Sequence, residues 1–489
     1  MPDISTLLAR IEKLIDEVET EAAARMDDWE KWAIRPAFRG SAANLAAYLA
    51  IRHQDLRGLQ RELMARGLTS LGRLENRVLA TLEALRAVLA ALAGKGPVPM
   101  VDEAGFFMGE KCLEARSQAL FGLGQSERHV ALLVTCPSEA IEDERFMRDL
   151  AARRVEAIRI NCAHDGPDAW ARMLANARAA EHASGHKFKI FMDLAGPKIR
   201  TGEVRARQQV KRLFPGDRVA MVAPGGLDRP VPADIAFTFE CTLREALGVQ
   251  PGQRLIIDDG KIAARVDAVL NGAVIASVER CKEEGAKLKS EKGINLPDSA
   301  LDVPALTAKD REDLAFVATH ADGIEFSFVQ SPDDVALLQE ALAEVRPGDW
   351  DRLALILKIE TAQAVHNLPE IIVRAGARQD VAVMIARGDL AIEIGFTRLA
   401  EMQEEILWIA EAAHVPVIWA TQVLEHLVKE GMPNRGELTD AAMAARAECV
   451  MLNKGPHLIE AIDALDPLLG RMGAHMHKKT PQLRRLMSW

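Results

Sequence analysis

Eight short apolar runs after residue 128 constrain the fold of this chain more than any other feature of its sequence. Each run is followed by polar residues and then by a stretch with helical spacing, which is typical of repeated βα units. The runs are residues 130–134, 155–160, 188–192, 323–328, 353–359, 381–385, 415–419 and 449–452. Eight parallel strands with intervening helices predict a closed (β/α)₈ TIM barrel. The expected fold class is therefore α/β.

The stretch between the third and fourth runs has a different pattern. Turn pairs such as Pro215-Gly216, Pro251-Gly252 and Asn271-Gly272 separate segments rich in Val and Ile, which predicts short strands joined by turns. We expect residues 203–293 to form a small, β-barrel-like domain that is inserted in a barrel loop and acts as a lid over the barrel mouth.

The first part of the chain has helical spacing. Apolar residues recur at intervals of three and four from residue 5 to about 93, and after the first helix two more are expected at 43–65 and 74–92. The domains predicted from these patterns are a helical domain and linker at 1–125, the barrel at 126–202 and 294–470, the lid at 203–293, and a C-terminal tail at 471–489.

Charge and composition exclude several classes of protein. The net charge of −10 disfavours a general attraction to nucleic acid or to anionic lipid. No run approaches the roughly 18 apolar residues that cross a bilayer, and the N-terminus lacks the basic-then-apolar order of a secretory signal. The six cysteines form no CxxC pair, so neither a zinc site nor a disulfide framework is indicated. We expect a cytoplasmic protein with no nucleic-acid or membrane partner.

The exits of the barrel strands carry the residues with chemical potential, because reactive groups in a parallel barrel gather where strands end. The fifth run ends with Lys358 and Glu360, which point the same way because side chains alternate along a strand. The sixth run ends with an Arg-Gly-Asp sequence that contains Gly388 and Asp389, and neighbouring strands lie about 4.8 Å apart. Glu360 and Asp389 are therefore candidates to share one Mg²⁺, with most of its shell left to waters and substrate oxygens.

Other exits add cations and hydroxyls. The second run ends with Arg159 and Asn161, followed by His164, and an arginine there suits bidentate capture of phosphate. The third run leads into residues 193–202, an acid and two cations around a tight turn, and the seventh leads to Thr421. Each feature alone is more often an ion pair, a turn or a helix cap than a site. Their common position at the exits of one predicted barrel favours a functional interpretation.

These residues resemble the pyruvate kinase family, from about residue 128 to about 469. The stretches that carry the resemblance are AIRINCAH, MDLAGPKIRTG, IIDDGKI, KGINLP, LTAKDREDLAF, LKIET, MIARGDLAIEIG and PVIWATQVLE, in the order and separation of the family. The resemblance implies transfer of a phosphoryl group from phosphoenolpyruvate to ADP or another nucleoside diphosphate, with Mg²⁺ as cofactor. The partners it implies are these two substrates, and a homo-oligomer is expected.

The resemblance also implies roles for individual residues. Glu360 and Asp389 would bind Mg²⁺, Lys358 would stabilise the transferring phosphoryl group and the enolate, Thr421 would support protonation of the enolate, and Arg159 would bind phosphate. The remaining implied contacts are to substrate, by Arg387, Gly388, Ser327, Phe328 and Asn161, and to nucleotide and phosphate, by Arg200, His164, Lys292, Asn453 and Lys454.

The chain departs from the family pattern in three places. Members that need K⁺ commonly show Asp-Thr-Lys-Gly-Pro-Glu where this chain has residues 193–198, and Ala163 replaces a serine that helps bind the ion. We hypothesise that the ammonium of Lys198 supplies the missing positive charge, so that Lys198 and Asp193 together stand in for the monovalent-cation site and K⁺ is not required. Residues 453–457 replace the Ser-Gly-Glu-Thr segment on the nucleotide side, where Lys454 can take over contacts to a diphosphate. The chain ends about twenty residues after the barrel, so the effector control of the usual C-terminal domain is expected to be absent.

Two other functions stay open at this point. Aldolases and lyases that act on phosphoenolpyruvate or pyruvate also bind Mg²⁺ at strand exits, although they lack the inserted lid and Arg200. A non-catalytic phosphoenolpyruvate-binding protein would explain the altered segment at 453–457, although the combination of Lys358, Glu360, Asp389 and Thr421 argues for chemistry.

Overall fold

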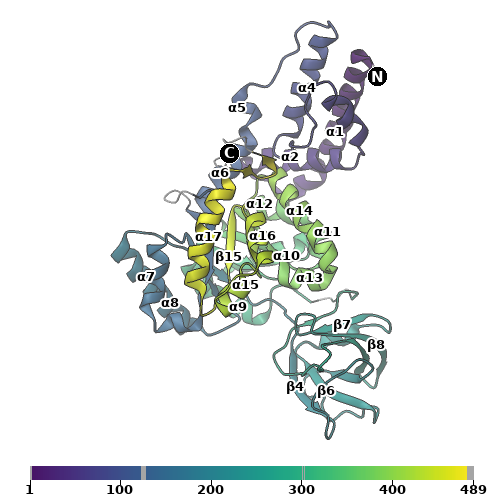
Figure 1. The fold of residues 1–489 in the computed structure, drawn as a ribbon, viewed down its shortest axis with the longest axis vertical. Helices are drawn as coiled ribbons and strands as arrows, with labels where there is room; N and C mark the ends of the chain where they lie inside the picture. The colour runs from purple at the N-terminus through teal and green to yellow at the C-terminus, as the bar shows by residue number, and fades with distance from the viewer. Residues whose placement is uncertain (1–2, 123–127, 300, 302, 482–489) are drawn as a thin grey trace.

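Three bodies follow one another along the long axis of the molecule (Figure 1). The computed structural model describes residues 3–122, 128–299, 301 and 303–481. A helical domain lies at one end, a barrel in the middle and a small β-domain at the other end. The predicted fold class, a TIM barrel with an inserted β-domain and N-terminal helices, is confirmed.

The barrel consists of eight parallel strands in the order β1-β15-β14-β13-β12-β11-β3-β2, closed on itself. The strands coincide with the eight predicted runs, and nearly all of their residues are buried because helices cover the outside. They are β1 (Ala131–Thr135), β2 (Ala157–Asn161), β3 (Lys189–Asp193), β11 (Gly323–Phe326), β12 (Ala354–Ile359), β13 (Val381–Ala386), β14 (Val417–Ala420) and β15 (Cys449–Leu452).

Helices alternate with these strands and form the outer layer. Three of them begin with a capping box, Thr307 with Asp310, Ser331 with Asp334 and Asn434 with Glu437, which fixes where each preceding loop ends. The helices are α7 (Glu144–Ala152), α8 (Pro167–Ser184), α9 (Ala308–His320), α10 (Pro332–Val345), α11 (Ala362–His366), α12 (Leu368–Gly376), α13 (Arg387–Ile394), α14 (Phe396–Ala412), α15 (Glu425–Glu430), α16 (Arg435–Ala444) and α17 (Leu458–Gly473).

The helical domain contains α1 (Ile4–Trp29), α2 (Pro36–Arg52), α3 (Arg57–Met64), α4 (Val78–Leu92), α5 (Glu103–Phe106) and α6 (Met108–Phe121). The prediction of one helix over 43–65 is wrong, because the chain breaks between α2 and α3. There the carboxylate of Asp55 accepts the amide N–H of Arg57 at 3.1 Å, a local bond that competes with the helical one. The helix expected at 74–92 begins at Val78, whose N–H is capped by the side chain of Asn44 at 3.0 Å.

The helical domain and the outer layer of the barrel share one continuous hydrophobic core. Polar contacts reinforce the junction: Arg116 donates to the carbonyls of Ala413 and His414, and the ring of His414 contacts Ser41 and Asn76. At the end of α6, Phe121 enters the barrel and meets Phe191 edge-on at 6.1 Å. The helical domain therefore closes the end of the barrel opposite the strand exits.

The inserted β-domain, called the lid below, is a seven-stranded sheet in the order β10-β7-β8-β9-β5-β6-β4. Its strands begin at Thr201 and end at Asn295, two residues outside each predicted bound. They are β4 (Thr201–Ala206), β5 (Arg218–Val222), β6 (Ile235–Cys241), β7 (Arg254–Ile257), β8 (Ile262–Leu270), β9 (Ala273–Arg280) and β10 (Ile294–Asn295). The hydrophobic clusters of the lid are separate from the core of the barrel and helical domain, so the lid is a packing unit of its own.

Two chain segments connect the lid to the barrel, and they are paired with each other. The N–H of Thr201 donates to the carbonyl of Lys292, and that of Ile294 donates to the carbonyl of Ile199, both at 2.8 Å. Residues 197–201 and 292–297 thus form one double-stranded hinge, which we call the lid hinge.

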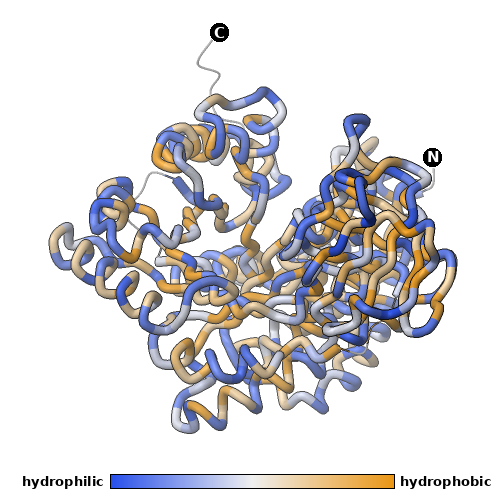
Figure 2. Tube along the Cα trace, turned by 90° about the horizontal axis from the view of Figure 1, so that it is seen from below, coloured by the Kyte–Doolittle hydropathy of each residue, from blue (hydrophilic) through white to orange (hydrophobic). Residues whose placement is uncertain are grey.

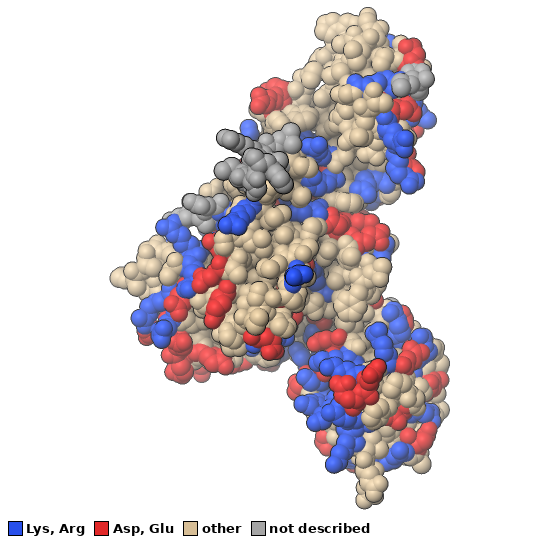
Figure 3. Space-filling view, viewed as in Figure 1, with Lys and Arg blue, Asp and Glu red and all other residues tan. Residues whose placement is uncertain are grey.

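Hydropathy and charge are distributed over the molecule with polar residues outside and apolar residues inside. Hydrophilic segments lie mainly on the outside, and hydrophobic segments run through the strands and the inner helix faces (Figure 2). Acidic and basic side chains are interspersed on the face seen in Figure 3, with Lys and Arg numerous on the lid. Among the described residues, no helix is long and apolar enough to span a membrane.

Part of the predicted tail forms a hairpin, β16 (Met476–His477) with β17 (Thr480–Pro481). Residues 482–489 of the tail lie outside the described residues.

Candidate active site

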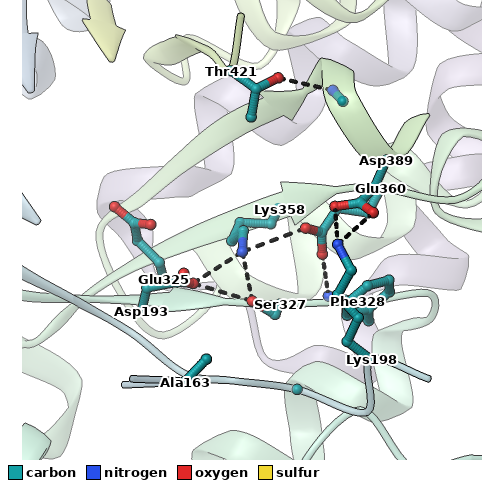
Figure 4. A network of polar contacts seen from close by, with 12 residues as sticks. Ala163, Asp193, Lys198, Glu325, Ser327, Phe328, Lys358, Glu360, Asp389 and Thr421 are labelled. Atoms are coloured by element: carbon teal, nitrogen blue, oxygen red, sulfur yellow. Dashed lines mark hydrogen bonds and ion pairs between the residues drawn. The ribbon is translucent and has the colours of Figure 1, made fainter. Parts of the chain in front are cut away.

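Lys358 and Glu360 stand side by side at the exit of β12, as the alternation of side chains predicts (Figure 4). The Nζ of Lys358 lies 3.4 Å from Oε1 of Glu360, and both residues are buried. Burial disfavours the charged form of Lys358, but Asp193 and Glu360 outweigh it and raise the pKa of the ammonium. The site therefore holds a permanent buried positive charge.

Asp193 at the end of β3 holds this lysine in place. Its Oδ1 accepts the Nζ of Lys358 at 3.0 Å and the hydroxyl of Ser327 at 3.1 Å. The Nζ also donates to the hydroxyl oxygen of Ser327 at 2.6 Å. Burial opposes ionisation of Asp193, but Arg159 and Lys358 lower the pKa of the carboxyl below its usual value. Both cations are thus tied to one carboxylate.

Arg159 is enclosed by protein acceptors inside the barrel. Its Nε donates to Glu325 at 2.8 Å, one Nη donates to the hydroxyl of Thr135 at 3.1 Å, and the other donates to Oδ2 of Asp193. These contacts use three of the five N–H donors of the guanidinium and leave two for a substrate oxygen. Asn161 lies two residues further along β2. Its side-chain oxygen accepts the N–H of Ala163 at 2.9 Å.

Glu325 is the residue of this cluster that the sequence interpretation missed. It is fully buried, and burial raises the pKa of its carboxyl to about 7 although Arg159 opposes the shift. Glu325 lies on β11, two residues before Ser327, which follows the strand. The alternation of side chains therefore predicts that both face the inside of the barrel, and this pattern could have identified Glu325.

Glu360 and Asp389 converge on one point at the mouth of the barrel (Figure 4). Oε2 of Glu360 accepts the N–H of Phe328 at 2.6 Å, and burial together with the charge of Asp389 raises the pKa of the Glu360 carboxyl. The ammonium of Lys198 lies 2.7 Å and 3.0 Å from the two oxygens of Asp389.

The arrangement of these two carboxylates fits a divalent cation. A positive group already contacts Asp389, and carboxylate oxygens are donors that Mg²⁺ prefers. Among the described residues, no group of three or more His, Cys, Asp or Glu side chains could hold a metal. A two-carboxylate site of this kind leaves most coordination positions to water and to substrate oxygens.

The start of α13 presents backbone donors beside the carboxylate pair. The side chain of Arg387 turns away to β14, where Nε donates to the carbonyl of Ala420 at 3.0 Å and the guanidinium lies over the ring of Trp419 at 4.7 Å. The N–H of Gly388 donates to the hydroxyl of Thr421 at 2.8 Å. The Arg387 side chain is therefore engaged with β14, and the Gly388 N–H is engaged with Thr421.

Backbone strain marks two of the strand exits. Phe328, after β11, has φ of 55°, and Thr421 and Gln422, after β14, have φ of 59° and 58°. Such left-handed conformations are costly for residues with side chains and are concentrated at functional sites. They direct the Phe328 N–H to Glu360 and the Thr421 hydroxyl to Gly388.

The predicted nucleotide-side residues include three cations, Arg200, Lys292 and Lys454, which we call the cationic rim. Burial lowers the pKa of His164, and the positive charges of Lys454 and Arg200 lower it further. Lys454 is exposed and Asn453 is half-buried. Lys292, on the lid hinge, lies 3.7 Å from a carboxylate oxygen of Asp258 and is about a third exposed.

Lys198 does not contact Asp193, with which it was expected to replace the monovalent cation. The oxygens of Asp193 are taken by Lys358, Ser327 and Arg159, whereas Lys198 reaches Asp389. The lid hinge brings Lys198 to this place. Beside it, a cavity of about 320 Å³ is lined by both hinge segments and by Phe328 and Glu393.

Comparisons with known proteins agree with this geometry. Residues 128–456, more than half of the chain, match the family described as "Pyruvate kinase, barrel domain". A pyruvate kinase of Agrobacterium vitis is 32% identical over 358 residues, which are 71% of this chain and 68% of that protein. One of Methylorubrum extorquens is 33% identical over 346 residues, 68% of this chain and 66% of that protein. One of Mycobacterium tuberculosis is 32% identical over 320 residues, 64% and 63% of the two chains. The chain thus spans about two thirds of the length of these relatives, and it belongs to the pyruvate kinase family.

Proposed function

We propose that this protein transfers the phosphoryl group of phosphoenolpyruvate to a nucleoside diphosphate such as ADP, which gives pyruvate and the triphosphate. The observation that carries the proposal is the convergence of Lys358 with the carboxylates of Glu360 and Asp389 at one rim of the barrel. Family membership supports it, because the relatives named above are pyruvate kinases. Phosphoryl transfer requires alignment and neutralisation of spreading charge more than covalent help, and this site offers both.

Each residue has a proposed part in the reaction. A Mg²⁺ ion held by Glu360 and Asp389 would neutralise charge on the oxygens of the substrates. The buried ammonium of Lys358 would stabilise negative charge on the transferring group, and the free N–H groups of Arg159 would orient the phosphate. The backbone N–H groups at the start of α13 would hold the carboxylate of phosphoenolpyruvate. Thr421 would orient a proton donor to the enolate carbon.

The acceptor is proposed to bind on the cationic rim. The positive charges of Arg200 and Lys454 act on His164, so a diphosphate bound there would meet two positive groups. Lys292 and Asn453 would complete the rim. The lid, which packs as a separate unit on a double hinge, would close over both substrates and exclude water as a competing acceptor.

We further propose that turnover does not require K⁺. Both oxygens of Asp193 are already neutralised by Lys358 and Arg159, and Ala163 has no hydroxyl to offer a monovalent ion. Lys198 adds a positive charge at the same mouth. Strong activation by K⁺ in rate measurements would contradict this part of the proposal. A cytoplasmic location and a homo-oligomeric state remain predictions.

The test is to incubate the full-length protein with phosphoenolpyruvate, Mg²⁺ and a panel of nucleoside diphosphates in K⁺-free buffer, and to quantify pyruvate and triphosphate together. We expect both products in equal amounts, and their loss in Lys358→Met. The matched control is Lys261→Met, which removes a half-exposed lid lysine paired with Asp258 at 3.1 Å. Pyruvate with inorganic phosphate in place of triphosphate would indicate a phosphatase, and tight binding of phosphoenolpyruvate without turnover would indicate a non-catalytic protein.

A further inference from the structure

The ammonium of Lys198 occupies the two carboxylate oxygens of Asp389, the side chain that would share a metal with Glu360. Its two contacts, at 2.7 Å and 3.0 Å, are both with Asp389 (Figure 4). A metal–oxygen distance for Mg²⁺ is about 2.0–2.1 Å. An ammonium and a dication cannot both contact the same two oxygens, because they would stand within a few ångströms of each other and repel.

We infer that Lys198 is an internal counter-ion that competes with the divalent cation for Asp389, so that metal binding requires displacement of its ammonium. The inference rests on the metal site of the proposed function and adds a determinant of its affinity. Lys198 is suited to the exchange because its side chain is a quarter exposed and that of Asp389 a fifth. The ammonium therefore has solvent into which it can move.

Because Lys198 lies on the lid hinge, the exchange of its ammonium for the metal would link metal binding to the lid. Lys198 lies in the first segment of the lid hinge, next to Ile199. The carbonyl of Ile199 accepts a hydrogen bond from the N–H of Ile294 in the second segment. The end of the Lys198 side chain also runs beside Gly293, where an added Cβ would come within 3.4 Å of the Lys198 Cε. The Lys198–Asp389 contact is thus an electrostatic tie between the lid hinge and the start of α13, and the arriving metal replaces it.

The experiment is a titration of the full-length, substrate-free protein with Mn²⁺, with free Mn²⁺ measured by electron paramagnetic resonance. We expect Lys198→Met to bind Mn²⁺ at least tenfold more tightly than the wild type. Lys198→Arg keeps the competing charge and should stay within threefold of the wild type. Lys261→Met, which removes a lid lysine paired with Asp258 and not with Asp389, should bind as the wild type does. Thermal unfolding of each variant checks that it is folded.

The outcomes separate this inference from the proposed function. Equal or weaker binding by Lys198→Met, with saturable binding by the wild type, overturns the competition and leaves the metal site intact. Weaker binding would show that Lys198 supports the metal instead. If neither protein binds Mn²⁺, or if Asp389→Asn binds it as well as the wild type, the metal site itself is refuted and the competition with it.

Discussion

Replacing Asp193 by Asn removes the charge that holds the two cations of the barrel interior while it keeps the shape of the side chain. Asp193 is 2% exposed and accepts from Lys358, Ser327 and Arg159. An amide in its place offers one acceptor oxygen and directs an NH₂ group at a positive partner. The result is a buried site with one negative charge fewer and a donor facing a donor.

The size of the effect follows from this count. Removal of one partner from a buried ion pair typically costs about 3–5 kcal/mol, because the remaining charge is left without compensation. In this barrel Glu325 still accepts from Arg159 and Glu360 still lies 3.4 Å from Lys358. We therefore expect the lower end, about 3 kcal/mol, together with loss of phosphoryl transfer because Lys358 is no longer anchored.

Chemical denaturation of the full-length protein, followed by circular dichroism, measures the change in free energy of unfolding. The matched control is Asp380→Asn, whose carboxylate pairs with Arg35 at 2.6 Å but has a side chain 60% exposed. A pair of that kind contributes at most about 1 kcal/mol. If Asp193→Asn is no more destabilising than Asp380→Asn, the buried charge network does not stabilise the barrel as argued.

Three further outcomes follow from other contacts. Burial lowers the pKa of His414 from 6.5 to about 4, so between these pH values this imidazole is protonated in the unfolded chain only. The free energy of unfolding should therefore fall by up to about 3 kcal/mol as the pH drops from 6.5 to 4. The denaturation midpoint of His414→Gln should depend less on pH over this range. Gly109→Ala would place a Cβ 2.4 Å from the His414 ring, so its melting temperature should drop by several degrees, whereas Gly40→Ala, with nothing within 4 Å, should melt at or above the wild-type temperature. Thr421→Val loses the hydroxyl that accepts from Gly388 and should lower kcat at least tenfold, and Thr421→Ser should restore most of it; equal rates would remove Thr421 from the mechanism.

Local patterns predicted most of the barrel. Each strand is an apolar run buried on both faces, and the alternation of side chains along β12 was enough to place Lys358 and Glu360 together. The break between α2 and α3 was missed because it depends on one competing bond from Asp55 to Arg57, which hydrophobic spacing does not register. The start of α4 was missed for a related reason, since its cap comes from Asn44 on another helix.

The approach of Glu360 to Asp389 from neighbouring strands was predicted, but the partners of Arg159 and Lys198 were not. Arg159 was expected to point at phosphate, and its enclosure by Glu325 depends on the pairing of β11 with β3, which lies next to β2. Lys198 was assigned to Asp193, which precedes it by five residues. Its actual partner, Asp389, lies 191 residues away in sequence, and the hinge of a separately packed lid decides that contact.

The most direct test of the account follows the phosphorus atom. ³¹P nuclear magnetic resonance of a reaction with phosphoenolpyruvate, ADP and Mg²⁺ but no K⁺ should show the phosphoenolpyruvate signal decreasing while the γ-phosphate signal of ATP increases by the same amount, in the wild type and not in Lys358→Met. Appearance of the phosphorus as inorganic phosphate, or no change in the wild type with any nucleoside diphosphate, would contradict the proposed transfer.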